Sequence, residues 1–116
     1  MTEASVTLIT GAGKGLGKAI AEEIVAKGDH VVLVVRSEAS AAALAQEFGA
    51  KAVVVTKDVT APDAAETAIA TGVARWGKVD GLVNNAGVVD PIARIADSDP
   101  TQWEATIAIN LLAPYR

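Results

Sequence analysis

The sequence predicts an α/β fold in which one parallel β-sheet carries helices on both faces. Short runs rich in Val and Ile alternate with Ala-rich segments of helical length along all 116 residues. Hydrophobic residues make up 51% of the chain but aromatic residues only 3%, so the core has to be built from small aliphatic side chains. Such packing suits helices that lie close against a sheet. Strands that alternate with helices run parallel through right-handed crossovers, so we expect one βαβαβαβα domain over residues 1–116.

Four strands are expected, at residues 6–10, 31–35, 52–56 and 79–84. Each is a short and nearly continuous apolar run, a pattern that buried helix segments also show. The β-branched residues in these runs and the glycines beside them favour strands. Continuous hydrophobicity further indicates strands that are covered on both faces.

Helices are expected between these strands. The first, residues 15–27, stops before Gly28 and turns four side chains toward the sheet: Leu16, Ala19, Ile20 and Ile24. The second, residues 38–48, stops before Gly49. In the third, residues 61–76, Thr60 is the expected N-cap and Pro62 lies in the first turn, with these residues inward: Ile69, Val73 and Trp76.

A fourth helix is expected to begin at Asp99-Pro100, again a capping residue followed by proline. Trp103, Ile107 and Leu111 recur along it at helical spacing. Pro114 should end or disturb this helix, because proline lacks the N–H that the helix needs and its ring clashes with the preceding turn.

Composition excludes several classes of protein. The formal net charge of −4 argues against a surface for nucleic acid or anionic membrane. No apolar run approaches the length of a membrane span, and the N-terminus lacks the pattern of a signal peptide. The absence of cysteine excludes a disulfide scaffold, a thiolate metal site and a thiol nucleophile. We expect a cytoplasmic protein without a metal site.

The loop after the first expected strand is rich in glycine. It reads Thr10-Gly11-Ala12-Gly13-Lys14-Gly15-Leu16-Gly17 and opens the first helix. Glycines permit a tight turn and let a diphosphate approach the backbone, while the first helical turn offers free N–H groups and a positive dipole end. The spacing differs from the common G-x-G-x-x-G, and no Walker A pattern fits. The loop favours a dinucleotide, with a purely structural tight turn as the other interpretation.

The loop after the second expected strand indicates which dinucleotide. Sites for NAD(H) usually place Asp or Glu there, about 20 residues after the glycines, to bind the ribose 2′-hydroxyl. Here the strand is followed by Arg36 and Ser37. A cation at this point attracts a 2′-phosphate, and Lys14 in the glycine loop can approach the same group. We therefore favour NADP(H) over NAD(H); the other interpretation of Arg36 is a solvated surface charge.

These motifs together resemble those of the short-chain dehydrogenase/reductase family. The glycine loop is similar to its T-G-x-x-x-G-x-G cofactor motif, and Asp58-Val59 to its adenine-contacting pair. Asn84-Asn85-Ala86-Gly87 matches its N-N-A-G motif, and Asn110 resembles its catalytic asparagine. The resemblance covers essentially the whole chain. It implies a Rossmann-like half-domain with strand order 3-2-1-4, from an NADPH-dependent oxidoreductase that acts on carbonyl or alcohol groups.

The resemblance also implies a role for each position. The expected cofactor-binding residues are Thr10, Gly11, Gly13, Lys14, Gly15, Leu16, Gly17, Arg36, Ser37, Asp58, Val59, Asn84, Asn85, Ala86 and Gly87. The glycine loop would hold the diphosphate, Asp58 would accept from the adenine amino group, and the N-N-A-G loop would lie beside the nicotinamide and its ribose. Asn110 would disturb its helix and hold a water in a proton relay.

Other interpretations stay open for several of these residues. Asp58 could instead assist Thr60 in capping the third helix. Asn84 and Asn85 could simply tie loops together. His30, the one histidine, is more consistent with a structural than a catalytic role.

The family's reaction also uses a Ser and a Tyr-x-x-x-Lys pair, which these 116 residues do not supply. Tyr115 has no residue four positions further on, so the catalytic tyrosine is not carried over to it. General-acid assistance contributes about 10²–10⁴-fold to such reactions. We therefore expect this chain alone to bind cofactor weakly at most and to reduce no carbonyl.

The implied strand order would leave the fourth strand at an open edge, and the fourth helix would lack neighbours for its apolar residues. We therefore expect a homodimer or higher oligomer that covers both. A second interpretation of the whole chain is a non-catalytic, self-assembling module that keeps the glycine loop only for its turn. A third is an enzyme completed by a separate C-terminal partner.

Overall fold

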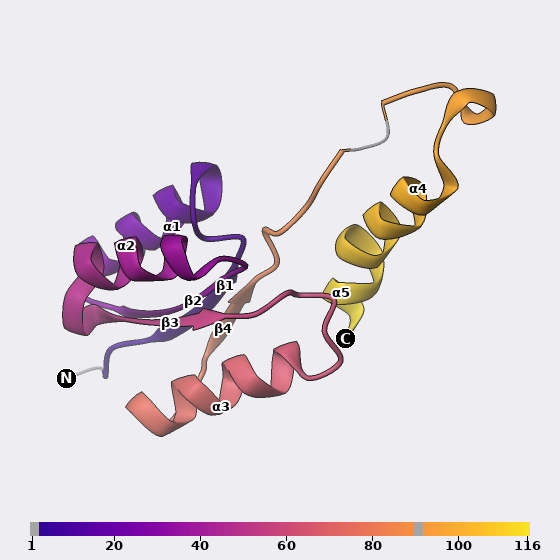
Figure 1. The fold of residues 1–116 in the computed structure, drawn as a ribbon. Coiled ribbons are helices and arrows are strands. Elements are labelled where there is room, and N and C mark those ends of the chain that lie inside the picture. The colour runs from indigo at the N-terminus through magenta and orange to yellow at the C-terminus, as the bar shows by residue number, and fades with distance from the viewer. Residues whose placement is uncertain (1–2, 90–91) are drawn as a thin grey trace.

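A computed structural model describes residues 3–89 and 92–116. Its elements, in chain order, are β1 Val6–Thr10, α1 Gly15–Ala26, β2 His30–Val35, α2 Glu38–Phe48, the 3-10 turn η1 Gly49–Lys51, β3 Ala52–Thr56, α3 Ala64–Trp76, β4 Gly81–Val83, the 3-10 turn η2 Ile95–Asp97, α4 Pro100–Ile107, the π-helical turn η3 Ala108–Leu112 and α5 Ala113–Tyr115. Helices α1 and α2 lie on one face of the sheet and α3 on the other (Figure 1).

The four strands form one parallel sheet in the order β3-β2-β1-β4. In this register Leu8 of β1 lies between Val32 of β2 and Leu82 of β4. The expected fold class and strand order are confirmed. Because the strands are parallel, the loops after β1, β2 and β4 lie together at the carboxyl ends of the strands. The strand order reverses at β1, and ligands bind beside such a reversal in folds of this kind.

Both faces of the sheet are covered by core. Ile9, Leu33 and Val35 pack toward α1 and α2, whereas Val32 and Val34 pack toward α3. Every residue from 31 to 35 is buried. This explains why the strand is apolar at each position, since neither of its faces meets water.

The face that α1 turns toward the sheet differs in part from the expected one. Ile20 and Ile24 pack against the core as expected, but Ala19 is exposed and Leu16 is 69% exposed, so the expectation is wrong for these two residues. The buried residues of the helix are Gly17 and Ala21. The helix begins so close to the loops beneath it that only the smallest residues fit on its inner face, and Leu16 is turned outward.

The inner face of α3 is likewise made of small residues: Ala64, Ala68 and Gly72. Trp76 packs against the core as expected, but Ile69 and Val73 are about half exposed, so this part of the expectation is wrong. A Cβ at Gly72 would lie 2.7 Å from Cγ2 of Val79 and 2.9 Å from Cγ2 of Val32. The helix therefore approaches the sheet at a distance that larger side chains would not allow.

Helix α3 also begins later than expected. Thr60 is not its N-cap, because both the backbone N–H and the hydroxyl of Thr60 donate to Oδ1 of Asp58, at 2.9 and 2.7 Å. These bonds form a separate turn, and the N-cap position falls to Asp63. Strand β4 is similarly shorter than the expected 79–84, since only its residues 81–83 pair with β1.

The last helical segment projects from the sheet (Figure 1). Asp99 caps α4 by accepting from the N–H of Thr101 at 3.0 Å, as the sequence indicated. The helix does not end at Pro114 but widens before it, where the N–H of Ala113 bonds to the carbonyl of Ala108. Pro114 would clash with the carbonyl of Asn110 in a regular helix, and this wider turn is the expected disturbance.

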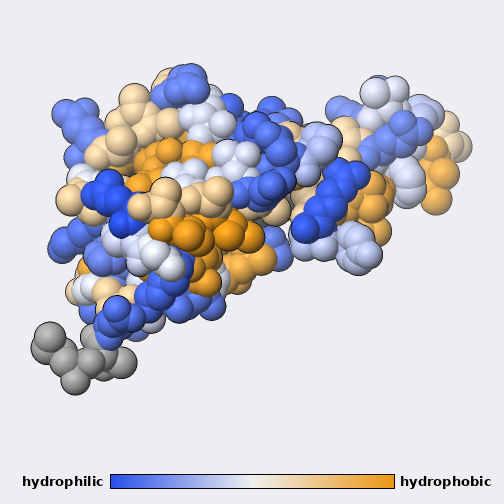
Figure 2. Space-filling view, turned by 90° about the horizontal axis from the view of Figure 1, so that it is seen from below, coloured by the Kyte–Doolittle hydropathy of each residue, from blue (hydrophilic) through white to orange (hydrophobic). Residues whose placement is uncertain are grey.

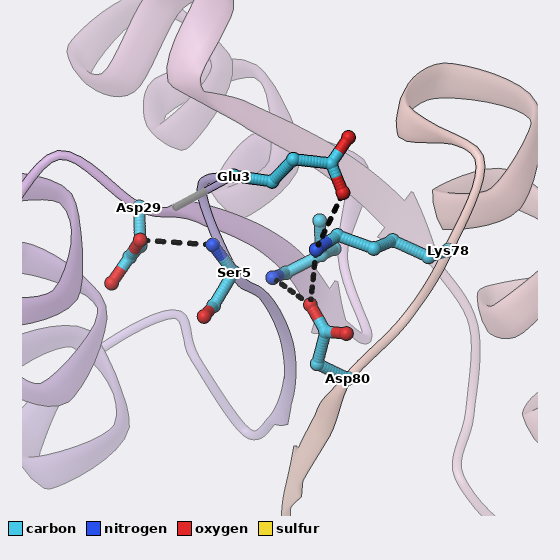
Figure 3. Close-up of polar contacts among 6 residues, drawn as sticks. Glu3, Ser5, Asp29, Lys78 and Asp80 are labelled. Atoms are coloured by element: carbon cyan, nitrogen blue, oxygen red, sulfur yellow. Dashed lines mark hydrogen bonds and ion pairs between the residues drawn. The ribbon is translucent and has the colours of Figure 1, made fainter. Parts of the chain in front are cut away.

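Two carboxylates hold the amino end of β1 (Figure 3). Oδ2 of Asp80 accepts from the N–H of Val6 at 2.8 Å, and Oδ1 of Asp29 accepts from the N–H of Ser5 at 2.9 Å. Lys78 lies 3.2 Å from Asp80. The N–H of Val6, and then Lys78, lower the pKa of the Asp80 carboxyl below its ordinary value. The charged form of Asp80 thus stabilises the pairing of β1 with β4.

We predict that this stabilisation depends on pH. Because the pKa of Asp80 is lower in the folded state than in the unfolded state, its contribution is present at neutral pH and is lost as the pH falls below about 4. Asp80→Asn should lower the Tm at pH 7, and the difference from wild type should shrink at pH 3. Thermal unfolding followed by circular dichroism measures both. Asp97→Asn, in an exposed pair with Arg94, is the matched control. An equal difference at both pH values would contradict the prediction.

The close approach at Gly72 gives a second prediction. In an exposed helix, Gly→Ala stabilises by about 1 kcal/mol. Here the added methyl meets the fully buried Val32, and overpacking of this kind costs about 1–3 kcal/mol. Gly72→Ala should therefore lower the free energy of unfolding in a urea titration. A stabilised variant would show that α3 can move away from the sheet freely.

Candidate functional site

A cavity of about 590 Å³ lies at the carboxyl ends of the strands. Its volume is typical of sites for small molecules. It is lined by ten of the residues expected to bind a cofactor: Gly11, Gly13, Lys14, Gly15, Arg36, Ser37, Val59, Asn85, Ala86 and Gly87. Six further residues complete the lining: Val34, Val35, Ser40, Lys57, Val88 and Ile109. The structure thus brings the loops after all four strands to one cavity.

The glycine loop follows a path that side chains would block. Gly11 has a φ of +63°, and a Cβ there would lie 2.9 Å from Cα of Ala86. A Cβ at Gly17 would lie 2.5 Å from the carbonyl oxygen of Gly11. The loops after β1 and β4 therefore touch through their backbones. This leaves the cavity side of the loop open to a ligand.

Hydrogen bonds hold these two loops together. The hydroxyl oxygen of Thr10 accepts from the N–H groups of Asn85 and Ala86, at 3.1 and 3.0 Å. The side-chain amide of Asn85 donates to the carbonyl of Gly11 at 3.0 Å. Thr10 and Asn85 thus fix the shape of the cavity floor. For Asn85, this is the loop-tying role that the sequence left open.

The amino end of α1 faces the cavity without a side-chain cap. Lys14 occupies the N-cap position in an extended conformation, and the first turn contains no acidic residue. The first N–H groups of a helix have no partner within the helix. Uncapped N–H groups and the positive end of a helix dipole are the features with which helix N-termini bind anions, so this end of the cavity has the chemistry to hold one.

The other end of the cavity is cationic. Arg36 follows β2 directly, and Ser37 caps α2 by accepting from the N–H of Ser40 at 3.1 Å. The Ser37 hydroxyl also lies 2.9 Å from that of Ser40. Lys57 lines the same region, and its N–H donates to the carbonyl of Val35 at 2.8 Å. This bond places Lys57 beside the end of β2, next to Arg36.

Lys57 and Ser40 were not identified from the sequence. Lys57 reads as an ordinary charge between a strand and the Asp58-Val59 pair, and Ser40 as a residue within a helix. The sequence signal that could have identified Lys57 is its position directly after β3, the strand that pairs with β2. Ser40 lies three residues after the N-cap Ser37, the spacing at which a capping side chain meets the helix.

Five expected cofactor residues do not line the cavity: Thr10, Leu16, Gly17, Asp58 and Asn84. Thr10 and Gly17 support the glycine loop from behind, whereas Leu16 points away from it. Asp58 lies beside Val59, and its bonds from Thr60, followed by the charge of Arg36, lower the pKa of its carboxyl. Asn84 lines a separate cavity of about 290 Å³ on the α3 side, so the structure does not bring it to the first one.

The side chain of Asn110 binds the backbone of Val88, a residue of the cavity lining. Its Oδ1 accepts from the N–H of Val88 at 2.9 Å, and its Nδ2 donates to the carbonyl of Val88 at 2.7 Å. In a regular α-helix the carbonyl of Asn110 would accept from residue 114, which is a proline without an N–H. The Asn110 carbonyl is thus left without that helical bond, and the neighbouring residue Ile109 lines the cavity.

Two findings on residues 3–89 and 92–116 concern membrane spans and metal sites. No helix there is long and apolar enough to cross a membrane. The same residues contain no group of three His, Cys, Asp or Glu side chains that could hold a metal ion. His30 stacks on Trp76 with the ring centroids 4.8 Å apart, away from the cavity lining.

Comparison with known proteins identifies relatives over nearly the whole chain. The sequence profile of the short chain dehydrogenases matches residues 5–116. The 3-oxoacyl-(acyl-carrier-protein) reductase FabG of Escherichia coli is 35% identical over 116 residues, which are 98% of this chain and 46% of that protein. The chain thus spans just under half the length of this relative.

Solved structures give the same result. The 3-ketoacyl-(acyl-carrier-protein) reductase of Brucella melitensis, crystallised with NADH, superposes with a TM-score of 0.91 at 34% identity and covers 97% of this chain and 47% of its own. A blue fluorescent protein from a metagenomic library, in complex with NADPH, gives a TM-score of 0.84 at 31% identity, over 96% of this chain and 47% of its own. Family profile, sequence relatives and fold agree, and the chain belongs to the short-chain dehydrogenase family.

Proposed function

We propose that this chain binds NADP(H) and is the cofactor-binding portion of an oxidoreductase acting on carbonyl or alcohol groups. One observation carries the proposal: among the described residues that line the cavity, three are cations, Lys14, Arg36 and Lys57, and none is a carboxylate. Such a lining suits a ligand with several phosphates. The relatives crystallised with NADH and with NADPH support a dinucleotide as the class of ligand.

The lining residues suggest a place for each part of a dinucleotide. The uncapped first turn of α1 and the open glycine loop would hold the diphosphate. Val59 would line the adenine pocket, and Asp58 beside it would accept from the adenine amino group. The loop Asn85-Ala86-Gly87 would lie along the nicotinamide ribose. When bound, the dinucleotide supplies the hydride of the family's reaction.

The charge at the end of β2 supports NADP(H) over NAD(H). An NAD(H) site usually places a carboxylate here to accept from the 2′-hydroxyl, and that carboxylate would repel a phosphate. Arg36 occupies the position instead, and the hydroxyl of Ser37 lies next to it. Hydrogen bonds between charged groups contribute about 1.5–3 kcal/mol each, which is enough to decide between the two cofactors.

We further propose that residues 1–116 bind the cofactor weakly and do not complete the reaction alone. Of the family's catalytic groups, these residues include the asparagine, as Asn110, which would hold a water through its free carbonyl. The Ser and the Tyr-x-x-x-Lys pair are not among them. The alternative function, a self-assembling module without a cofactor, predicts no binding of either dinucleotide.

Exposed apolar residues support self-association as a property of the same chain. Leu82 of the edge strand β4 is 58% exposed, and Trp103 and Leu111 on the projecting segment are also exposed. Figure 2, which views the molecule from the α3 side, shows apolar side chains gathered on this face and along the projecting segment. A second copy of the chain would cover these surfaces and the open edge of β4.

The cofactor proposal is tested by titration with NADPH and NADH, in parallel and up to millimolar concentration, followed by nicotinamide fluorescence. We expect saturable binding that favours NADPH. Arg36→Ala should weaken NADPH binding by about 10–100-fold, because one bond between charged groups is lost, and should change NADH binding by less than about twofold. Arg94→Ala, on an exposed arginine outside the cavity, is the control. Binding of neither cofactor, or equal losses of both, would contradict the proposal.

Self-association is tested by light scattering on the chain after gel filtration. We expect a species of at least twice the chain mass. Leu82→Lys, which places a charge on an exposed edge residue, should shift the population toward the monomer. Leu16→Lys adds the same charge at an exposed position on the other face of the sheet and should leave the population unchanged. A monodisperse wild-type monomer would exclude association through β4.

A further inference from the structure

Lys57 is the third cation of the cavity and has no place in the cofactor contacts described so far. Its backbone is fixed by the bond from its N–H to the carbonyl of Val35. In the parallel register Val35 lies opposite Thr56, so the next residues on the two chains, Arg36 and Lys57, are neighbours. The Lys57 side chain is only 28% exposed although it is charged. Lys57 is also among the residues that line the cavity, at the same end as Arg36.

The ammonium of Lys57 is paired with a carboxylate that lies outside the cavity. Its Nζ is 2.9 Å from Oδ2 of Asp63, at the amino end of α3. Asp63 is not among the cavity residues, and its side chain is 56% exposed. The hydrogen bond from Lys57 lowers the pKa of the Asp63 carboxyl, so the carboxylate is charged at neutral pH. Lys57 thus has one anionic partner now and a cavity for a second.

The Lys57–Asp63 pair is weaker than a pair between Lys57 and a phosphate, so a phosphate can replace Asp63. A solvent-exposed ion pair such as Lys57–Asp63 changes an equilibrium by at most about fivefold. A bond from an ammonium to a phosphate inside a cavity changes it by about tenfold or more. The Asp63 carboxylate is therefore weak enough to be displaced by a phosphate, yet it competes with that phosphate for the same ammonium.

We propose that Lys57 recognises the 2′-phosphate together with Arg36, and that Asp63 restrains Lys57 and so sets how strongly NADPH is preferred over NADH. This inference rests on the proposed binding of NADP(H). Other charges face the same place: Arg36 from the end of β2, Lys14 from the glycine loop, and Asp58, the next residue along the chain. Asp58 is held by Thr60, so Asp63 is the acid that ties up the cavity's third cation.

A purely structural role for the Lys57–Asp63 pair makes a different prediction. The pair also joins the end of β3 to the start of α3 and encloses the turn made by Asp58 and Thr60. If it only holds this turn, its loss would alter the adenine end of the site and weaken both cofactors equally. A role in phosphate recognition separates NADPH from NADH.

The test is a double-mutant cycle read by titration of the full chain with NADPH and NADH. Lys57→Gln should weaken NADPH binding by about tenfold and NADH binding by less than about twofold. Asp63→Asn should strengthen NADPH binding by about two- to fivefold, since it frees the ammonium, and should leave NADH binding unaltered. In the Lys57→Gln background, Asp63→Asn should have no effect. Lys57→Arg, which keeps the charge, should preserve the preference. Lys27→Gln removes a surface lysine from a pair with Glu23 at the far end of α1 and is the matched control.

Three results would overturn the inference, and they differ from failure of the proposed function. Equal losses of both cofactors in Lys57→Gln would reduce the pair to a structural contact. An unchanged NADPH affinity in Asp63→Asn would remove the competition. A wild-type preference for NADPH that disappears in Arg36→Ala but persists in Lys57→Gln would leave NADP(H) binding intact and exclude Lys57. Binding of neither cofactor by wild type would overturn both proposals. Thermal unfolding of each variant shows whether it is folded. If Lys57→Gln does not fold, the titrations of Asp63→Asn and Lys57→Arg test the inference instead.

Discussion

The contact between the loops after β1 and β4 is the constraint on which the site depends. Gly11 and Gly17 meet the backbone around Asn85 and Ala86 with no space for a side chain. Thr10 and Asn85 then close the contact with three hydrogen bonds. Because both loops leave adjacent parallel strands, the sheet itself brings them together. One short contact thus fixes the cavity floor and turns the amino end of α1 toward the cavity.

The helices also pack closely against the sheet. Gly72 and Ala68 of α3, and Gly17 and Ala21 of α1, are the residues that approach the sheet, and larger apolar side chains are displaced to the flanks. Although the chain has a net charge of −4, the charged residues among the described cavity lining are Lys14, Arg36 and Lys57. Local placement, rather than overall charge, determines what this cavity attracts.

The sequence predicted most of the fold and most of the cavity, and each of its errors has a physical cause. Continuous Val and Ile runs and glycine boundaries identified the strands, because nothing else in the chain competes with those signals. The helix faces were partly wrong because periodicity assigns Ile69 and Leu16 to the core, whereas glycine and alanine carry no comparable signal. Thr60 has the sequence of an N-cap, but Asp58 takes both of its donors. Lys57 escaped notice because its place beside Arg36 comes from the pairing of β3 with β2, which only the register reveals.

In the projecting segment, Pro114 determines the shape of the helix around Asn110. Pro114 does not fit a regular helix four residues after Asn110, and the helix responds with the wider turn at Ala108–Leu112 instead of ending. Two hydrogen-bonded links then tie this segment to the rest of the molecule: the amide of Asn110 to Val88, and Arg116 to the carbonyl of Thr60 at 3.2 Å. The first link lies beside the cavity, where Ile109 also contributes to the lining. Pro114, which cannot supply an N–H to the carbonyl of Asn110, therefore widens the helix instead of ending it, while the side-chain amide of Asn110 ties this turn to Val88.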